Sequence, residues 1–244
     1  MSLSKNQTKL INSLRQKKYR QENGLFIAEG IKVVKELIKS DLEIERLFVT
    51  EENCISINEM NKVVLITESE LKKVSSFKTP NKVLGIFKVP KMKPIKQSGL
   101  ILALDSINDP GNLGTIIRLC DWFGIEQLIC STDTVDCYNQ KVIQSTMGSI
   151  TRVNIVYTDL VDFLKKSELP TFTADMNGQN VYKTELPEEA VLIMGNEANG
   201  ISNEVKSVIQ EQLTIPRFGR IQETESLNVA TATSILLSEF KRRL

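Results

Sequence analysis

The chain has 244 residues, of which 41% are hydrophobic and 25% charged, and its formal net charge at pH 7 is +1. These values are typical of a globular protein, and the near-neutral charge argues against a uniformly basic nucleic-acid-binding surface. The sequence contains no histidine. This excludes catalytic triads with a histidine base and metal sites with histidine ligands.

The remaining composition indicates a reduced, non-membrane environment. No apolar run approaches the roughly 20 residues of a membrane span, and the N-terminus lacks the apolar core of a signal peptide. The cysteines show no close pairing, which favours reduced buried thiols over disulfides or a zinc site; they are Cys54, Cys120, Cys130 and Cys137. We therefore expect a cytoplasmic protein that binds no metal and no membrane.

A linker rich in proline and lysine, residues 89–99, divides the chain. It predicts two domains, over residues 1–92 and 97–244. The hydrophobic periodicity of the first predicts a small α/β/α sandwich. Its expected helices are 7–20, a segment opening at Glu29-Gly30, and 68–75, and its expected strands are 25–28, 47–49, 63–66 and 83–87.

The second domain repeats strand, loop and helix. Its first strand, 100–104, is continuously apolar, as in a mostly parallel sheet that is covered on both faces. The further expected strands are 127–130, 154–157, 171–174 and 191–194. The expected helices are 113–123, with Gly124 as C-cap, 139–146, 160–165, 202–210 and 226–241.

Three blocks place glycine and asparagine at the ends of apolar runs: 108–118, 193–202, and 215–219 continuing to 225–230. The loops at the carboxyl ends of the strands are where an α/β sheet binds ligands. The first block offers glycines for close backbone approach and a helix N-terminus with free N–H groups. Arg118 follows at the edge of a buried helix face, from which we expect it to reach back toward the loop.

The other two blocks carry polar side chains beyond what a turn needs. Glu197 is not required for a strand-to-helix turn, so its carboxylate could order the glycine loop or a substrate hydroxyl. Ser226 is most economically a helix N-cap, and Asn228 falls within the first turn with no such role. The chain has neither a GxGxxG nor a GxxxxGK[ST] motif, so the common dinucleotide and P-loop sites are unsupported.

Basic residues gather in three stretches, at 1–20, 88–96 and 241–243. Each stretch alone is typical of a solvated helix face or a linker. Together with the ligand loops, they are also consistent with an anionic partner.

The three blocks, in this order and spacing, resemble the SpoU (TrmH) family of RNA ribose 2′-O-methyltransferases, of the SPOUT class. The first resembles an Asn-x-Gly-x-x-x-Arg motif, the second a Gly-x-Glu-x-x-Gly motif, and the third an Ile-Pro…Gly…Ser-Leu-Asn-Val motif. The stretch 220–225 is longer than the commonest family spacing. The first domain resembles the family's L7Ae/L30e-like substrate-binding domain most clearly at Phe26–Gly30.

The resemblance implies S-adenosylmethionine as cofactor, a deep trefoil knot in the SPOUT domain, and a homodimer with the active site at its interface. The implied cofactor-binding residues are Gly195, Asn196, Gly200, Ile215, Pro216, Gly219 and Leu227. The implied catalytic residues are Asn112, Arg118, Glu197, Ser226 and Asn228.

We expect Arg118 to hold the ribose hydroxyl and stabilise developing alkoxide charge, because an arginine is effectively always protonated. The family also suggests Arg118 as a base, assisted by phosphate, and Glu197 is a further candidate. The expected substrate is ribosomal RNA first and tRNA second. Two other hypotheses are a base methyltransferase acting on a guanine nitrogen and a non-catalytic RNA-binding protein on the same knotted scaffold.

Overall fold

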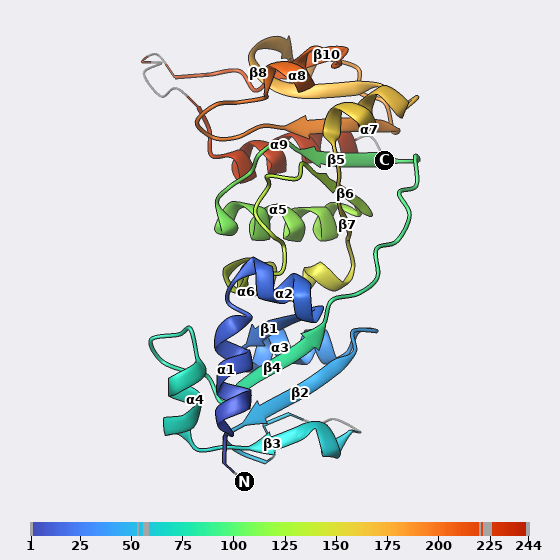
Figure 1. Ribbon diagram of the computed structural model, residues 1–244. Coiled ribbons are helices and arrows are strands. Elements are labelled where there is room, and N and C mark those ends of the chain that lie inside the picture. The colour runs from blue at the N-terminus through green and yellow to red at the C-terminus, as the bar shows by residue number, and fades with distance from the viewer. Residues whose placement is uncertain (1, 53, 56–58, 220, 222–225, 243–244) are drawn as a thin grey trace. The chain divides into compact units, whose positions relative to one another are not determined.

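The computed structural model describes residues 2–52, 54–55, 59–219, 221 and 226–242 (Figure 1). The chain divides into two compact units, Met1–Lys91 with Asp136–Thr151, and Met92–Val135 with Arg152–Leu244. Residues 136–151 thus group with the N-terminal part of the chain. The domain limits expected from the linker stay a prediction.

The first unit is built on a four-stranded sheet of order β1-β4-β2-β3. β4 runs antiparallel to β1 and β2, and β3 is parallel to β2. The strands are β1 (Leu25–Glu29), β2 (Ile44–Val49), β3 (Val63–Leu65) and β4 (Val83–Lys88). The helices are α1 (Lys5–Ser13), α2 (Lys17–Asn23), α3 (Ile31–Ile38), α4 (Glu68–Val74) and α6 (Gln140–Thr146), with the 3-10 turns η1 (Met60–Lys62) and η2 (Ser149–Thr151).

Apolar side chains cover both faces of this sheet. Ile27 and Ile86, paired between β1 and β4, belong to a buried cluster with residues of α1 and α4. Phe26 and Phe87 point to the opposite face, with their ring centroids 5.7 Å apart. The Tyr138 ring lies 4.8 Å from Phe26, which adds residues 136–151 to this second layer.

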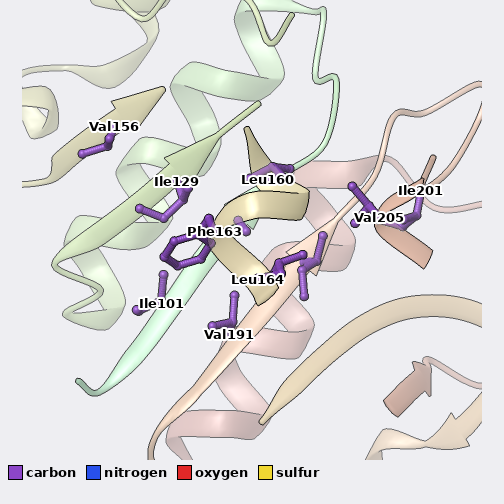
Figure 2. Packing of buried hydrophobic residues seen from close by; sticks show 11 residues of the cluster. Ile101, Ile129, Val156, Leu160, Phe163, Leu164, Val191, Ile201 and Val205 are labelled. Carbon is purple, nitrogen blue, oxygen red and sulfur yellow. The ribbon is translucent and has the colours of Figure 1, made fainter. Parts of the chain in front are cut away.

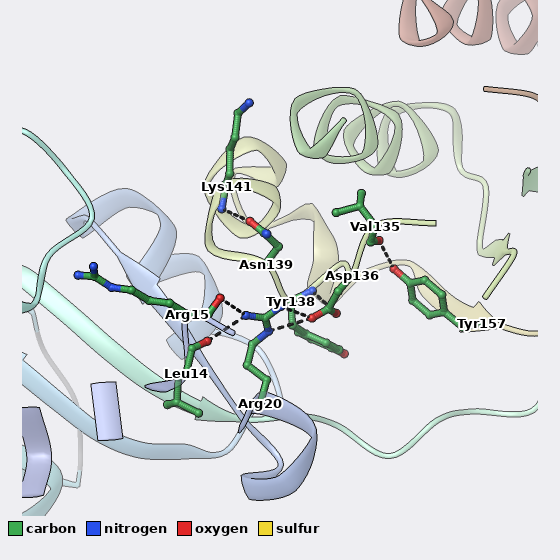
Figure 3. A network of polar contacts seen from close by, with 9 residues as sticks. All are labelled: Leu14, Arg15, Arg20, Val135, Asp136, Tyr138, Asn139, Lys141 and Tyr157. Carbon is green, nitrogen blue, oxygen red and sulfur yellow. Dashed lines mark hydrogen bonds and ion pairs between the residues drawn. The ribbon is translucent and has the colours of Figure 1, made fainter. Parts of the chain in front are cut away.

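The helix expected over 7–20 is wrong in one respect, because it is broken into α1 and α2. The break frees the carbonyls of Leu14 and Arg15, and the Arg20 guanidinium donates to both at 2.9 Å. Arg20 also pairs with Asp136, at 2.8 Å from Nε and 2.5 Å from Nη2 (Figure 3). The buried arginine side chain therefore compensates for the interrupted helix.

The second unit contains a six-stranded sheet of order β10-β8-β9-β5-β6-β7, in which every neighbouring pair is parallel. The strands are β5 (Leu100–Leu104), β6 (Gln127–Cys130), β7 (Asn154–Tyr157), β8 (Thr171–Asn180), β9 (Ala190–Met194) and β10 (Glu211–Thr214). The helices are α5 (Pro110–Phe123), α7 (Leu160–Lys166), α8 (Asn203–Lys206) and α9 (Val229–Lys241), with the 3-10 turn η3 (Val181–Lys183). The prediction of a mostly parallel α/β sheet is confirmed, and the trefoil knot stays a prediction.

One face of this sheet is covered by α7 and α8. Phe163 of α7 lies over the sheet among residues of β5, β6 and β9, within one buried cluster (Figure 2). Ile201 and Val205 bring α8 into the same cluster. On the other side, α5 packs against α9 and β6. The continuous apolar strand β5 is buried along its whole length, as the sequence predicted.

The boundaries of three predicted helices differ from the structure. α5 begins at Pro110 because Asp109 caps it, and proline suits the first helical position. α9 begins at Val229 rather than at 226. α8 ends at Lys206 and is followed by β10, an edge strand whose one fully buried residue is Leu213, so its sequence carries little strand periodicity.

The four cysteines are free thiols, as predicted, and three of them are buried. Burial raises the pKa of the Cys120 thiol. In the described part of the chain, no helix is long and apolar enough to cross a membrane. The described residues also contain no group of three or more potential metal ligands.

The Arg20–Asp136 pair gives a stability prediction. Asp136→Ala should leave the arginine charge buried without its carboxylate, and the expected loss of unfolding free energy is about 3 kcal/mol. Urea unfolding measures the loss. The matched control is Glu43→Ala, which removes an exposed ion pair with Lys88 in the same unit and should cost far less than Asp136→Ala. Equal losses in the two variants would contradict the role assigned to the buried pair.

Candidate active site

The loops that follow β5 and β9 are joined by hydrogen bonds. The Asp105 N–H donates to the Met194 carbonyl at 2.9 Å, and the Asp105 carboxylate accepts from the Ser202 N–H at 2.7 Å. The Asn196 side-chain amide donates to the Ser106 carbonyl at 2.7 Å. Because β5 and β9 are parallel neighbours, their carboxyl ends lie at the same sheet edge. The first two sequence blocks therefore meet.

The β9–α8 loop is a tight backbone fold that depends on two glycines. Asn196 and Gly200 exchange backbone hydrogen bonds of 2.9 and 2.8 Å. A Cβ at Gly195 would lie 2.5 Å from the Gly200 carbonyl carbon and 2.6 Å from the Ile201 nitrogen, so this position requires glycine. Gly200 has φ +66°, a left-handed conformation that favours glycine. The loop thus exposes backbone with little side-chain cover.

Asn112 occupies the first turn of α5 instead of the loop before it. Asp109 is the N-cap, and its carboxylate accepts the Asn112 backbone N–H at 2.8 Å. Asp109 and Pro110 therefore form the start of the helix itself. This placement fixes the backbone of Asn112 and directs its amide toward the other two blocks.

One chain of hydrogen bonds connects all three blocks. The Asn112 Nδ2 donates to Glu197 Oε1 at 2.5 Å, and the Asn112 Oδ1 accepts from Asn228 Nδ2 at 2.9 Å. The Asn228 Oδ1 accepts in turn from the N–H groups of Ala230 and Thr231, at 3.0 and 3.3 Å. Each amide is thus used at both its donor and its acceptor end.

The prediction about the start of the last helix is corrected by this geometry. Asn228, expected within the first turn, is the N-cap of α9, whereas Ser226 lies two residues earlier and is exposed. Asn228 therefore has two functions, since it caps α9 and also binds Asn112. The structure does not place Ser226 in the hydrogen-bond chain.

Arg118 is exposed on α5 and stands apart from the chain of amides. Among the described residues its side chain makes no hydrogen bond or ion pair, and its expected reach back toward the loop stays a prediction. Trp122, one helical turn further, is 84% exposed. A guanidinium with five free donors, beside a large exposed ring, is available to an external ligand.

The expected cofactor residues of the third block lie in the segment that connects β10 to α9. Ile215 and Pro216 are partly buried, Gly219 is exposed, and Leu227 is 47% exposed. Their roles as cofactor contacts stay a prediction. Of the lengthened stretch 220–225, residues 220 and 222–225 lie outside the described residues.

Two residues at the end of β5 were missed by the sequence analysis. The Asp105 side chain is buried and holds the start of α8, as described above. Ser106 has φ +58°, which is uncommon for a residue other than glycine, and its hydroxyl donates to Asp133 at 2.5 Å. Hydroxyl donation by Ser106 and Ser131 lowers the pKa of Asp133. The feature of the sequence that could have identified Asp105 is a carboxylate directly after a strand of apolar residues.

Comparison with known proteins identifies the family. The SpoU rRNA methylase family profile matches residues 99–238. The chain belongs to the SpoU rRNA methylase family. Residues 5–85 of this SpoU-family protein match an MRM3-like substrate-binding domain. Both compact units therefore have counterparts among known proteins.

Three relatives of the SpoU-family protein match nearly its whole length. RlmP of Bacillus subtilis, a 23S rRNA (guanosine(2553)-2′-O)-methyltransferase, is 30% identical over 92% of this chain and 91% of its own. A TrmH-family structure from Porphyromonas gingivalis is 38% identical with a TM-score of 0.89, covering 99% of both chains. The AdoMet-bound rRNA methyltransferase of Sinorhizobium meliloti is 29% identical with a TM-score of 0.88, covering 100% of this chain and 98% of that one.

These relatives confirm the predicted family, the class of enzyme and S-adenosylmethionine (AdoMet) as its cofactor. The glycine loop fits such a cofactor, because Gly200 is exposed and has open space at its Cβ position, which leaves the loop backbone accessible to a ligand. Exposed apolar side chains of the third block, Phe218 at 83% and Leu227, offer surface to a nucleoside base. The residues present thus suit the cofactor.

The chain of amides gives a charge-dependent prediction. Asn112→Asp replaces the donor to Glu197 by a second carboxylate, and repulsion between the two ionised carboxylates should destabilise the protein. Protonation of either carboxylate removes this repulsion, so the loss of stability should grow as pH rises. The deficit in melting temperature relative to the unmodified protein should be large at about pH 8 and small at about pH 5.

A rescue variant tests the same hydrogen bond. Adding Glu197→Gln to Asn112→Asp reverses donor and acceptor and should restore stability at high pH, with methyl-transfer activity following it. Asn177→Asp, at an exposed position of β8, is the control and should show no comparable pH dependence. An Asn112→Asp deficit that is independent of pH and is not relieved by the second change would contradict the interaction.

Proposed function

We propose that this protein methylates a ribose 2′-hydroxyl of ribosomal RNA. The carrying observation is the hydrogen-bond chain through Asn112, which joins the three sequence blocks at one sheet edge. The full-length similarity to RlmP supports ribosomal RNA as the substrate. A transfer RNA substrate is the alternative within the same chemistry.

We assign cofactor binding to the second and third blocks. The β9–α8 loop around Gly195, Asn196 and Gly200 would contact the cofactor with its backbone. The residues of the third block would pack against the adenosine; they are Ile215, Pro216, Gly219 and Leu227. S-adenosylmethionine supplies a methyl group on a positively charged sulfur, which leaves the protein to position the hydroxyl and assist the loss of its proton.

Arg118 is the group we assign to the ribose. A guanidinium stays protonated at physiological pH, so its contribution is to donate hydrogen bonds to the 2′-oxygen as negative charge develops. The proton itself must go to an acceptor, and a neighbouring phosphate of the RNA is suited to receive it. Glu197 accepts the bond from Asn112, which suits it to holding the loop rather than to proton transfer.

Two alternatives of different kinds lead to different products. A non-catalytic RNA-binding protein would not need the cofactor loop and Arg118 together, and this chain retains both. A base methyltransferase would place the methyl group on a guanine nitrogen. Digestion of the methylated RNA to nucleosides separates the products, since only the proposed reaction gives a 2′-O-methylribose.

We also propose a cytoplasmic homodimer with a knotted C-terminal domain and an active site at the subunit interface. Trp122 and Arg118 are four residues apart on α5 and therefore lie on one side of the helix. Tryptophan and arginine are enriched at the energetically important positions of interfaces. A second copy covering this side of α5 would bring Arg118 to the cofactor loop of its partner.

The role proposed for Arg118 can be tested by replacing this residue. Arg118→Ala should leave S-adenosylmethionine binding near normal and lower methyl transfer at least about a hundredfold, the loss typical of removing one such donor. A radiolabelled methyl assay on deproteinised ribosomal RNA measures transfer, and calorimetry measures binding. Arg152→Ala, which removes a surface pair with Asp121, is the control. Unchanged turnover in Arg118→Ala would remove this residue from the mechanism.

The proposed dimer, with an active site shared between subunits, can be tested with mixed dimers. Arg118→Ala and Gly195→Ala should each be inactive, the latter because the added Cβ meets backbone. If each site combines Arg118 of one subunit with the cofactor loop of its partner, a mixed dimer keeps one intact site. An equal mixture should then recover about a quarter of the full activity after subunit exchange. No recovery in verified mixed dimers would place both residues in the same subunit's site.

A further inference from the structure

We propose that the groove between α1 and α4 binds phosphate groups of the RNA backbone. The proposal rests on the function proposed above and adds a contact site for that substrate. The groove is lined by Leu3, Lys5, Thr8, Lys9, Glu70 and Lys73. Three of its lining side chains are therefore lysines, contributed by two helices.

The three lysines are free to bind an external anion. Lys5 and Lys9 are one helical turn apart on α1, so they lie on the same side of that helix. Lys73 comes from the last turn of α4. All three are exposed, and none forms an ion pair with any residue that the structure describes. They leave a local excess of positive charge.

Glu70 also lines the groove, but its carboxylate is hydrogen-bonded to groups of the surrounding backbone and side chains. Its carboxylate accepts from the backbone N–H of Leu3 at 2.9 Å and of Thr67 at 2.8 Å, and from the Thr67 hydroxyl at 3.0 Å. Donation by the backbone of Thr67 and Leu3 lowers the pKa of Glu70, so it remains ionised. One negative charge then opposes three positive charges.

The walls of the groove are fixed before any ligand arrives. Capping boxes close the N-termini of both helices, with Ser4 and Gln7 at α1 and Thr67 and Glu70 at α4. Ile11 of α1 and Leu71 and Val74 of α4 are buried in one hydrophobic cluster, which packs the two helices together. The backbones that carry the lysines are therefore pre-organised, which reduces the entropy cost of binding.

The structure separates these lysines from their basic neighbours in residues 1–20. Arg20 is buried against Asp136, and Arg15 donates to the carbonyls of Val74 and Ser75. Lys18 lies 3.8 Å from Glu22. These residues already have partners within the first unit, whereas Lys5 and Lys9 line the groove.

The chemistry of the groove fits a phosphodiester backbone. Lysine acts as a point charge toward phosphate and offers no planar fork for reading a base edge. The Thr8 hydroxyl already donates to the Ser4 carbonyl at 3.1 Å, so the lysines supply the free donors. Contacts of this kind position RNA without reading its sequence, and this unit matches a substrate-binding domain.

The test compares two triple variants with equal change in net charge. Lys5→Gln, Lys9→Gln and Lys73→Gln together remove the groove lysines. Lys35→Gln, Lys39→Gln and Lys72→Gln together remove exposed lysines outside the groove, and Lys72 neighbours Lys73 on α4. Affinity for ribosomal RNA is measured by filter binding with the full chain at several salt concentrations.

The groove variant should bind RNA at least about tenfold more weakly at about 0.1 M salt, and its salt slope should fall by about 2. Its KM for RNA should rise, while kcat and S-adenosylmethionine affinity stay unchanged. The control variant should retain most of the affinity and slope. A further variant with arginine at the three groove positions should restore binding, because the positive charge is retained.

Two results would overturn the proposal. One is equal loss of RNA affinity in the groove and control variants, which would indicate a general charge effect. The other is weak binding by the arginine variant, which would indicate a structural role for the lysines. Failure of the proposed function is distinguishable, since the unmodified protein would then bind RNA without methylating its ribose.

Discussion

The candidate site depends on the side-chain amide of Asn112. An amide carries a donor and an acceptor on adjacent atoms, so it can join a carboxylate on one side to a second amide on the other. Here it joins Glu197 of the β9–α8 loop to Asn228 at the start of α9. Aspartate would lack the donor and leucine would lack both groups. Segments 116 residues apart in sequence are held together by this one group.

The polar groups that shape the site are also those that begin and end its secondary structure. Asp109 caps α5 and thereby fixes Asn112, while Asn228 caps α9 with the oxygen that its amide does not use for Asn112. Asp105 ends β5 and holds the start of α8. Helix starts need such groups in any case, because their first N–H groups lack intrahelical partners. The fold therefore supplies a positioned polar cluster without burying extra polar groups that lack partners.

The predictable parts of the structure were those determined by local sequence. The strand over 100–104 and the Gly124 C-cap follow from apolar continuity and from glycine's tolerance of positive φ, and both are found. The broken helix could not be predicted, because the arginine that binds its freed carbonyls is itself held by an aspartate 116 residues away in the sequence. Asn228 was misplaced for a similar reason, since a cap and a helix interior differ by contacts that periodicity does not contain. The motif positions were found, whereas their hydrogen-bond partners required the fold.

The net charge of +1 does not show that individual basic residues have different roles in this protein. Arg20 is buried and neutralised, so its charge stabilises the first unit and is not available to a ligand. Arg118 is exposed and uncommitted, whereas every polar atom of the Asn112 side chain, on the same helix, has a partner. Hydrogen-bonded amides and a free guanidinium on the same helix separate two requirements of catalysis, since the amides hold the loops and the arginine keeps its donors for the substrate. Replacing the amides should therefore disturb stability and activity together, whereas replacing the arginine should disturb activity alone.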